Sequence, residues 1–387
     1  MFAYGIFKVI YAPHKAFKEI IQNPKYIGPI LIMILVAVAN MGFIYAIASK
    51  TYVEQTLPTA EQLDSWTENS TLWTLPLGVT ARDCNDDYIN GTYYGNKSME
   101  FSTVNSSQIS MQLNNIGSVK CSDPDGYKNL SLRIKWVSPE NTPENATIYL
   151  LSSTISDYFY YNLTGNVFNS TGNVWNNITI PLETEGWLSN SATAEWRNIT
   201  GLSLEFAWRE STNLTVRVDG LFFRGIFKSY MENITSYMFN FSVIALMQFI
   251  IQWVFLGIVL YIMTKAFGAK TGWRPLLILI GSALITLFVQ AAINAVAYST
   301  LPTLYYRLEL IGGVSGESEI AYSKILEQTW LASLISRYVQ IGVYVWTTVL
   351  CAIATRLVAE FSWTKSALVA TVAYFASLLV QSLILGF

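Results

Sequence analysis

Five long stretches of this sequence carry almost no charged residues, and each one is long enough to cross a lipid bilayer as a helix. A transmembrane helix needs about 20 consecutive, mostly apolar residues. The stretches that meet this requirement are residues 27–48, 241–263, 275–298, 330–355 and 366–387. Backbone inside hydrocarbon must satisfy its own hydrogen bonds, so the sequence predicts an α-helical membrane bundle of five transmembrane helices.

Lysine and arginine residues near the ends of these stretches predict their orientation. Cytoplasmic loops are enriched in these residues, above all when the loops are short. The basic residues on one side are Lys8, Lys15, Lys18, Lys25, Lys265, Lys270, Arg274, Arg356 and Lys365. We therefore expect a multi-pass plasma-membrane protein with a cytoplasmic N-terminus, whose residues 49–238 and C-terminus are extracellular. No cleavage-type run of small residues follows the first stretch, which predicts a retained signal anchor.

Residues 1–26 are expected to form a cytoplasmic amphipathic segment. Pro13 interrupts a mixture of apolar residues and lysines, which predicts a short turn and then a helix from about His14. Two interpretations stay open for this helix. Either it lies in the membrane interface with its basic face toward anionic headgroups, or it packs under the bundle.

Residues 49–238 have a different pattern, in which Thr, Tyr, Val and Ile alternate with polar residues between closely spaced turn residues. This alternation predicts strands, and many short strands without a helical pattern predict an all-β sandwich. The candidate strands include 98–103, 108–113, 130–137, 147–153, 158–163, 175–181, 201–208 and 215–223.

The same segment is rich in the Asn-x-Ser/Thr pattern that accepts N-linked glycans. The matching residues are Asn69, Asn90, Asn96, Asn105, Asn129, Asn145, Asn162, Asn169, Asn177, Asn198, Asn213 and Asn233. Their density predicts an N-glycosylated domain; the alternative is a polar β domain with accidental matches. Cys84 and Cys121 also lie here, and an extracellular location favours a disulfide between them.

Three segments follow one another in an order that suggests a known architecture: GTYYGNKSMEF at 91–101, VWNNITIP at 174–181 and VRVDGLFF at 216–223. Residues 91–225 thereby resemble galactose-binding-like jelly rolls. The resemblance implies that the closing Asp219 helps to bind a structural Ca²⁺ ion, with Glu100 as a second oxygen ligand. A turn or bulge at Asp219-Gly220 is the alternative.

The jelly-roll resemblance also implies sugar binding by exposed aromatic side chains. Most tryptophans in a sandwich belong to its core, so only part of this set is expected to be accessible. The tryptophans in question are Trp66, Trp73, Trp187, Trp196 and Trp208.

The apolar parts of the chain resemble a second family. The segments KVIYAPHKAFKEI at 8–20, NPKYIGPILIMILV at 23–36 and FGAKTGWRPLLILIG at 267–281 are similar to the first span and a later loop of Yip-family membrane proteins. The resemblance is closest to prokaryotic, especially archaeal, members and implies a cell-envelope protein with five spans. The acidic signatures of the eukaryotic members are missing, which argues against vesicle trafficking.

Polar residues inside the apolar stretches are candidates for function, because they are costly in hydrocarbon. They come in pairs three or four residues apart, which places each pair on one helix face. The pairs are Gln248 with Gln252, Gln290 with Asn294, and Arg337 with Gln340. They form either a polar pathway or hydrogen bonds between helices, with Arg337 extending toward the interface.

No phosphate-binding loop, dinucleotide glycine pattern, metalloprotease helix or nucleophile elbow occurs in the sequence. The net charge of −2 and the lack of basic clusters argue against nucleic-acid binding. We expect a non-enzymatic envelope protein without a cofactor beyond structural calcium. It would be a membrane-anchored binding or scaffolding domain and an accessory subunit of a membrane complex. Its partners would then be the lipid bilayer, its own covalent N-glycans and other envelope or membrane-complex subunits. The alternative is a transporter or channel component that uses the polar residues of the bundle.

The glycan prediction has a direct test in the intact mass of the protein isolated from its native membrane. We expect chemical deglycosylation to lower this mass, because N-linked glycans add mass at exposed asparagines. Protein made in a host without N-glycosylation is the control. An unchanged mass of the native protein would contradict the prediction.

Overall fold

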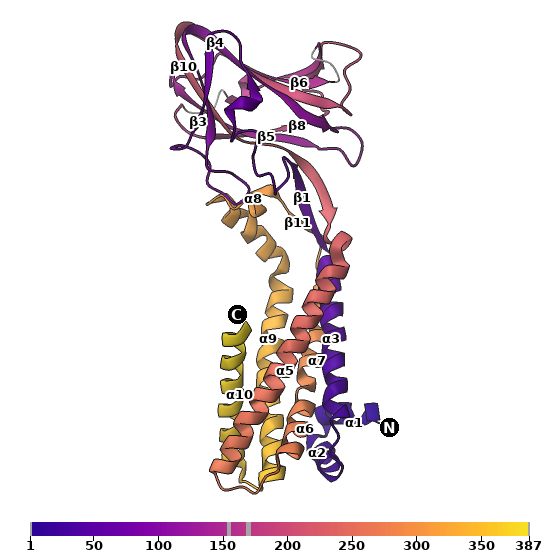
Figure 1. Ribbon diagram of the computed structural model, residues 1–387. Helices are drawn as coiled ribbons and strands as arrows, with labels where there is room; N and C mark the ends of the chain where they lie inside the picture. The colour runs from indigo at the N-terminus through magenta and orange to yellow at the C-terminus, as the bar shows by residue number, and fades with distance from the viewer. Residues whose placement is uncertain (1, 153–155, 168–171, 386–387) are drawn as a thin grey trace. The chain divides into compact units, whose positions relative to one another are not determined.

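The computed structural model describes residues 2–152, 156–167 and 172–385, and the chain divides into two compact units. The helical unit consists of Met1–Thr51, Ser229–Leu304 and Ile325–Phe387, and the β unit consists of Tyr52–Lys228 and Tyr305–Lys324. Both can be followed by their labels in Figure 1. The predicted outer segment thus folds together with a short second segment from much later in the chain.

The helices lie mainly in the helical unit, although the short helices α4 and α8 belong to the β unit. Their bounds are α1 Phe2–Tyr11, α2 Pro13–Gln22, α3 Ile27–Ala48, α4 Thr164–Val167, α5 Ile234–Ala266, α6 Trp273–Ala283, α7 Ile285–Ser299, α8 Leu308–Ile311, α9 Glu317–Ala359 and α10 Trp363–Leu385. Two 3₁₀ turns, Ser70–Leu72 and Tyr230–Asn233, complete them. Among the described residues, five helical segments are long and apolar enough to cross a membrane; α6 and α7 together make one of these.

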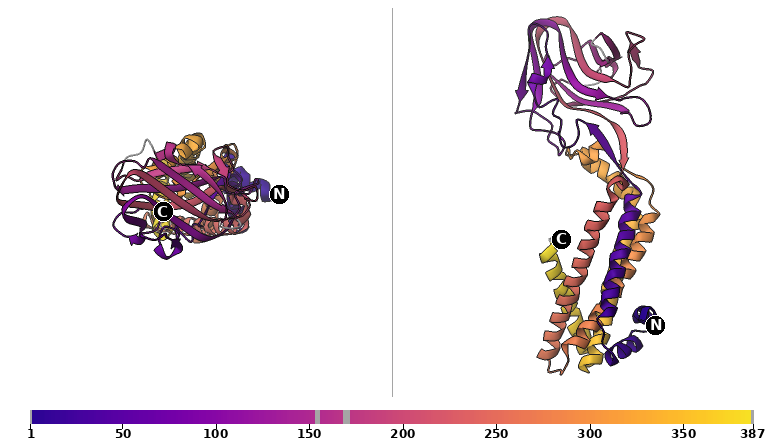
Figure 2. Two further views of the ribbon diagram at one scale, coloured as in Figure 1. Left: turned by 90° about the horizontal axis from the view of Figure 1, so that it is seen from above. Right: turned by 45° about the vertical axis from the view of Figure 1, so that its right-hand side comes forward.

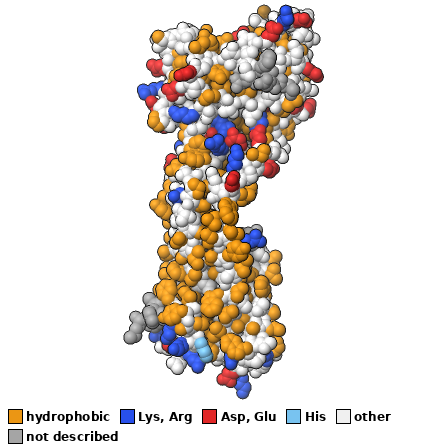
Figure 3. Space-filling view, turned by 180° about the vertical axis from the view of Figure 1, so that it is seen from behind, with side chains coloured by type: hydrophobic (Ala, Val, Ile, Leu, Met, Phe, Trp, Pro, Cys, Tyr) orange, Lys and Arg blue, Asp and Glu red, His pale blue; other side chains and the backbone are white. Residues whose placement is uncertain are grey.

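The five apolar helices confirm the predicted stretches, with two differences in length. The helices α5 and α9 run well beyond 241–263 and 330–355 into polar sequence. Helical backbone hydrogen bonds do not require apolar side chains, so hydropathy marks only the apolar part of such a helix. On the face shown in Figure 3, apolar side chains cover most of the helical unit, and basic side chains are most numerous toward one end.

The amphipathic N-terminal segment forms two helices rather than a turn and one helix. Pro13 begins α2 at a position where its missing N–H costs nothing, and it separates α2 from α1. Val9 of α1 and Phe17 of α2 are fully buried in the same apolar core as Leu276 and Ile280 of α6. Of the two interpretations of this segment, the structure favours packing against the bundle.

The β unit is a sandwich built from one network of hydrogen-bonded strands. Their bounds are β1 Thr51–Leu57, β2 Trp73–Thr74, β3 Val79–Cys84, β4 Ser98–Val119, β5 Asn129–Ser138, β6 Asn145–Ser152, β7 Asp157–Asn162, β8 Asn176–Pro181, β9 Trp187–Ser189, β10 Ile199–Ser229 and β11 Leu304–Tyr306. The long strands β4 and β10 pair with each other and take part in both layers. Figure 2 shows these strands in a second orientation.

The pairing partners of β10 define the two layers. Its residues 199–207 pair with β6, and β7 and β9 follow on the same side. Its residues 215–224 pair instead with β5, which is followed by β8. Fully buried side chains such as Phe101, Trp136 and Phe206 fill the space between the layers.

The segment Tyr305–Lys324 is held in the β unit by apolar packing and by ion pairs with two buried arginines. Leu308 packs with Tyr94 and Phe222 in a small core of its own. Arg224 of β10 binds Glu54 at 2.9 Å and Glu309 at 2.8 Å. Arg133 of β5 donates to both carboxylate oxygens of Glu317, at 2.9 and 2.7 Å. These contacts tie the connection between α7 and α9 to the sandwich.

We expect R224A to lower the free energy of unfolding of the β unit by about 3–5 kcal/mol, because the change leaves the buried carboxylate of Glu54 unpaired. Urea unfolding followed by near-ultraviolet circular dichroism measures this loss. Hydrogen exchange of residues 305–316 should accelerate in the same variant. K120A, which removes an exposed ion pair with Asp125, is the control and should change neither quantity. Equal behaviour of the two variants would contradict the role of Arg224.

Candidate functional sites

One layer of the sandwich carries a continuous outward row of side chains. The strand register aligns one residue from each of six strands: Thr74 of β2, Gln112 of β4, Ser203 of β10, Tyr149 of β6, Tyr160 of β7 and Leu188 of β9. Their neighbours along each strand, such as Met111, Leu204 and Ile148, point into the core and are fully buried. The row is therefore the outer surface of this layer.

Three tyrosines lie close together on this surface, with their rings inclined to one another; we call this surface the tyrosine face. The ring centroids of Tyr149 and Tyr158 lie 5.5 Å apart, and Tyr160 lies 6.3 Å from each of them. All three side chains are partly exposed. The Tyr149 hydroxyl donates to Glu205 Oε2 at 3.1 Å, and burial together with the Glu205 charge raises the pKa of Tyr149 to about 12.

Polar side chains continue the tyrosine face toward β2. Gln112 donates from Nε2 to Asn114 Oδ1 at 2.7 Å, and Asn114 donates from Nδ2 to Thr74 Oγ1 at 3.0 Å. Flat aromatic rings thus stand beside a row of amide and hydroxyl groups held in fixed orientations. Such a surface offers both apolar ring faces and hydrogen-bond partners to a ligand.

The tryptophans proposed for sugar binding lie elsewhere. Trp66, Trp73, Trp187 and Trp208 are buried in the sandwich core, and Trp196 stacks on Phe159 with ring centroids 4.1 Å apart. The sequence signal for the tyrosine face was the alternation in DYFYYN, residues 157–162, where two tyrosines two positions apart share one side of a strand. Its partner on β6 could not be assigned without the register.

The two residues predicted to bind calcium have different partners in the structure. Glu100 forms ion pairs with Arg82 and Arg217, and these two cations make its carboxylate a poor ligand for another cation. Asp219 lies at a bulge between β10 and β5, where Gly220 has a φ of 55° that favours glycine. The bulge of the alternative interpretation is therefore present at this dipeptide, and calcium binding by Asp219 and Glu100 stays a prediction.

Asp219 instead lies beside a second buried carboxyl group, that of Asp64. Asp219 accepts hydrogen bonds from the backbone N–H groups of Ile89, at 2.6 Å, and Gly220, at 2.7 Å. Asp64 accepts from the backbone N–H of Gly95 at 2.7 Å, and both side chains have no exposed surface. Burial first, and then Asp64, raise the pKa of Asp219 well above its usual range. Two such groups are stable together when they share a proton.

The predicted disulfide is not formed in the structure, where Cys84 and Cys121 are both free and buried. Cys84 pairs with Ser98, the first residue of β4, whereas Cys121 follows Val119, the last residue of that strand. A disulfide requires the two Cα atoms to lie within about 7 Å of each other. The length of β4 keeps the two thiols apart, so the pairing of these cysteines was wrong.

The predicted glycosylation sites lie on accessible parts of the β unit. Of the asparagines whose side chains the structure describes, none is buried. Asn169 lies outside the described residues. Asn145 and Asn162 belong to the outward side of β6 and β7, at the edge of the tyrosine face. Glycosylation itself stays a prediction.

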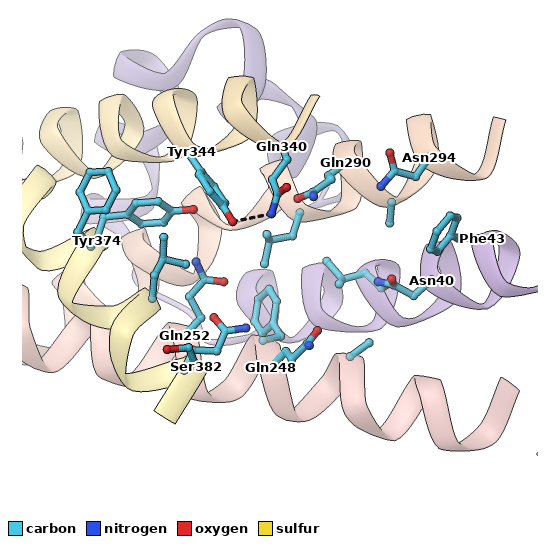
Figure 4. Close-up of a pocket in the computed structure, with 18 of the residues that line it drawn as sticks. Asn40, Phe43, Gln248, Gln252, Gln290, Asn294, Gln340, Tyr344, Tyr374 and Ser382 are labelled. Atoms are coloured by element: carbon cyan, nitrogen blue, oxygen red, sulfur yellow. Dashed lines mark hydrogen bonds between the residues drawn. The ribbon is translucent and has the colours of Figure 1, made fainter. Parts of the chain in front are cut away.

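The helical unit contains a cavity of about 590 Å³ lined by residues of α3, α5, α7, α9 and α10. Its polar lining includes Asn40, Gln248, Gln252, Gln290, Asn294 and Gln340, drawn in Figure 4. All the glutamines and the asparagine singled out in the apolar stretches therefore meet in one place. Arg337 does not line the cavity, and its side chain is exposed.

The amides of the cavity make few hydrogen bonds with each other. Gln340 donates to the Tyr344 hydroxyl, one turn further along α9, and Asn40 donates to the Val36 carbonyl within α3. Among the described residues, Gln252 Nε2 and Asn294 Oδ1 have no hydrogen-bond partner. The structure thus brings the predicted polar residues together without joining them as helix-to-helix hydrogen bonds.

No protein-family model matches this chain, and no curated protein is similar to it. The resemblance to the Yip family therefore stays a prediction. Solved structures similar to the β unit include a family 11 carbohydrate-binding module from Clostridium thermocellum, in complex with a mixed-linked tetrasaccharide. It has 16% identity and a TM-score of 0.28, and the match covers 44% of this chain and 94% of that module. A carbohydrate-binding module specific for non-crystalline cellulose has 9% identity and a TM-score of 0.24, over 40% and 88%. A β-1,2-glucanase from Parabacteroides distasonis has 17% identity and a TM-score of 0.28, over 41% and 24%.

The acid pair gives a prediction about the pH dependence of stability. An unfolded aspartate loses its proton near pH 4, at about 3.9. The folded chain keeps the Asp219 proton to higher pH, so the stability that this pair contributes falls as the pH rises from about 4 through the raised pKa. D64N replaces one carboxyl group by an amide that can donate to Asp219.

We therefore expect the free energy of unfolding of D64N, relative to the unmodified protein, to increase between pH 4 and pH 8. Urea unfolding at several pH values measures this difference. D125N, at an exposed carboxylate paired with Lys120, is the control and should give a flat difference or one of opposite sign, since the pKa of Asp125 is lowered. A difference for D64N that does not grow with pH would contradict proton sharing.

Proposed function

We propose that this chain is a non-enzymatic, multi-pass membrane protein whose β unit binds a carbohydrate chain at the tyrosine face. The five apolar helices support the membrane location, since each is long enough to cross a bilayer. The basic residues of the short loops support a cytoplasmic N-terminus and an extracellular β unit and C-terminus. The resemblance of the apolar segments to archaeal Yip-family members is what favours a cell envelope of archaeal type.

The observation that carries the proposal is the combination of ring faces and fixed polar groups on one surface. A sugar ring has apolar C–H faces and a rim of hydroxyl groups. The rings of Tyr158 and Tyr160 suit the apolar faces. Ser203 and Glu205 of β10 lie two strands away on the same surface, and Gln112 of β4 lies three strands away, where they can accept or donate hydrogen bonds to further sugar units. The row crosses the whole layer, so it suits an extended saccharide better than a compact ligand.

Binding without catalysis fits the groups that are present on this surface. Among the residues that the structure describes, the tyrosine face carries one carboxylate, that of Glu205, and this group already accepts a hydrogen bond from Tyr149. Glycoside hydrolysis uses a pair of carboxyl groups that flank the bond to be cleaved. We accordingly propose a role in holding an envelope or environmental polysaccharide, as an accessory subunit of a larger membrane complex.

The experiment uses the full-length protein in nanodiscs and a panel of immobilised neutral and acidic polysaccharides, with binding measured by biolayer interferometry. We expect saturable binding to at least one polysaccharide and a loss of about tenfold in affinity for Y158A and for Y160A, which corresponds to about 1.4 kcal/mol. The loss follows from removal of a ring that covers the sugar.

The control is Y322A, at an exposed tyrosine of α9 that lies away from the tyrosine face. Its affinity should equal that of the unmodified protein. Binding that is unaffected by Y158A and Y160A would contradict the location of the site. Absence of binding to the whole panel would contradict the proposed function.

A further inference from the structure

The amide-lined cavity of the helical unit carries polar atoms that lack partners. Gln252 is 3% exposed and Asn294 is 8% exposed, and both line the cavity. Their atoms Nε2 and Oδ1 have no hydrogen-bond partner among the described residues, and the same holds for Oε1 of Gln381 on α10. A buried polar group without a partner is unfavourable, so these three atoms favour a bound molecule that satisfies them.

The lining limits the chemistry of that molecule. The cavity lining contains amide, hydroxyl and apolar side chains, and none of the described lining residues is Lys, Arg, His, Asp or Glu. A charged group would be left without a counter-ion in a low-dielectric site, which is costly. Amides offer both donors and acceptors, which matches hydroxyl groups. This lining suits an uncharged ligand that bears hydroxyl groups.

The mouth of the cavity indicates where the ligand comes from. Phe375 and Leu379 of α10 line the cavity and are 53% and 66% exposed, and Gln340 of α9 is exposed as well. The cavity therefore opens on the side surface of the helical unit, between apolar side chains. In a membrane such a surface faces lipid, and Phe43, Leu287 and Leu378 line the cavity as apolar partners for hydrocarbon.

We propose that this cavity binds the headgroup of a lipid that carries hydroxyl groups and no charge, with its hydrocarbon chains leaving through the mouth at α10. The volume of about 590 Å³ lies within the range of about 300–1,000 Å³ typical of small-molecule sites. The inference rests on the proposed membrane crossing and is independent of carbohydrate binding by the β unit. Figure 4 shows the labelled amides arranged around the common space.

The test uses the full chain, purified in detergent and freed of lipid, with native mass spectrometry to count bound lipids. The probes are dioleoylglycerol, which is uncharged and has a free hydroxyl, dioleoylphosphatidylglycerol, which is anionic, and free glycerol. We expect saturable binding of dioleoylglycerol, and neither saturable binding of the anionic lipid nor binding of free glycerol.

The variants Q252M and N294L keep the approximate length of each side chain, and N294L also keeps the branching, but they remove the unpaired amide atoms. Combined, they should weaken dioleoylglycerol binding at least tenfold. T355V is the matched control, because Thr355 is also buried with an unpartnered Oγ1 but does not line the cavity; its binding should be unchanged. If the double variant fails to fold, as judged by size-exclusion chromatography and circular dichroism, the binding of dioleoylglycerol by N294L alone is compared with that of T355V.

Three results would overturn the proposal. Equal binding of all lipids to the unmodified protein and the double variant would show non-specific association with the detergent micelle. Binding of free glycerol at the same site would indicate that the ligand is a polar solute and not a lipid, and it would favour a transport function. No binding of any probe would leave ordered water as the partner of the amides. Protease protection of reconstituted protein tests the membrane crossing separately, so the two failures are distinguishable.

Discussion

The β unit depends on the burial of Arg224 between Glu54 and Glu309. A guanidinium group keeps its charge at every accessible pH, so a buried arginine requires carboxylate partners. Arg224 belongs to the sandwich, whereas Glu309 belongs to the connection between α7 and α9. The pair of Arg133 and Glu317 repeats this arrangement. The sandwich is therefore completed by a second segment, and it is more than an insertion between the first two apolar helices.

This construction separates two surfaces with different chemistry. The ion pairs belong to the layer of β5 and the second half of β10, while the tyrosine face belongs to the layer of β6 and β7. The first stabilises the unit and the second remains accessible to a ligand. The amide-lined cavity lies in the helical unit and shares no residue with either. A substitution on the tyrosine face therefore need not disturb the ion pairs that stabilise the fold.

The alternation of apolar and polar residues predicted many of the strand residues correctly, but it divided two long strands into shorter ones. Residues 98–103 and 108–113 belong to one strand, β4, and residues 201–208 and 215–223 belong to one strand, β10. Asn105 has a φ of 52°, and register shifts follow it, so the alternation breaks while the pairing continues. The predicted disulfide between Cys84 and Cys121 was wrong for a related reason. No local pattern in the sequence shows that β4 continues unbroken and separates the two cysteines.

The sequence alone determined the five apolar helices, because the length of an apolar stretch can be counted along the chain and a bilayer-spanning helix needs a fixed minimum length. It also determined the helix face on which Gln248 and Gln252 lie, since their spacing follows from the helical repeat. Only the tertiary structure decided that these glutamines meet Gln290, Asn294 and Gln340 in one cavity. It alone placed the tryptophans in the core and the tyrosines on the outer surface. These outcomes depend on the packing and register of segments far apart in the chain, which no short stretch of sequence specifies.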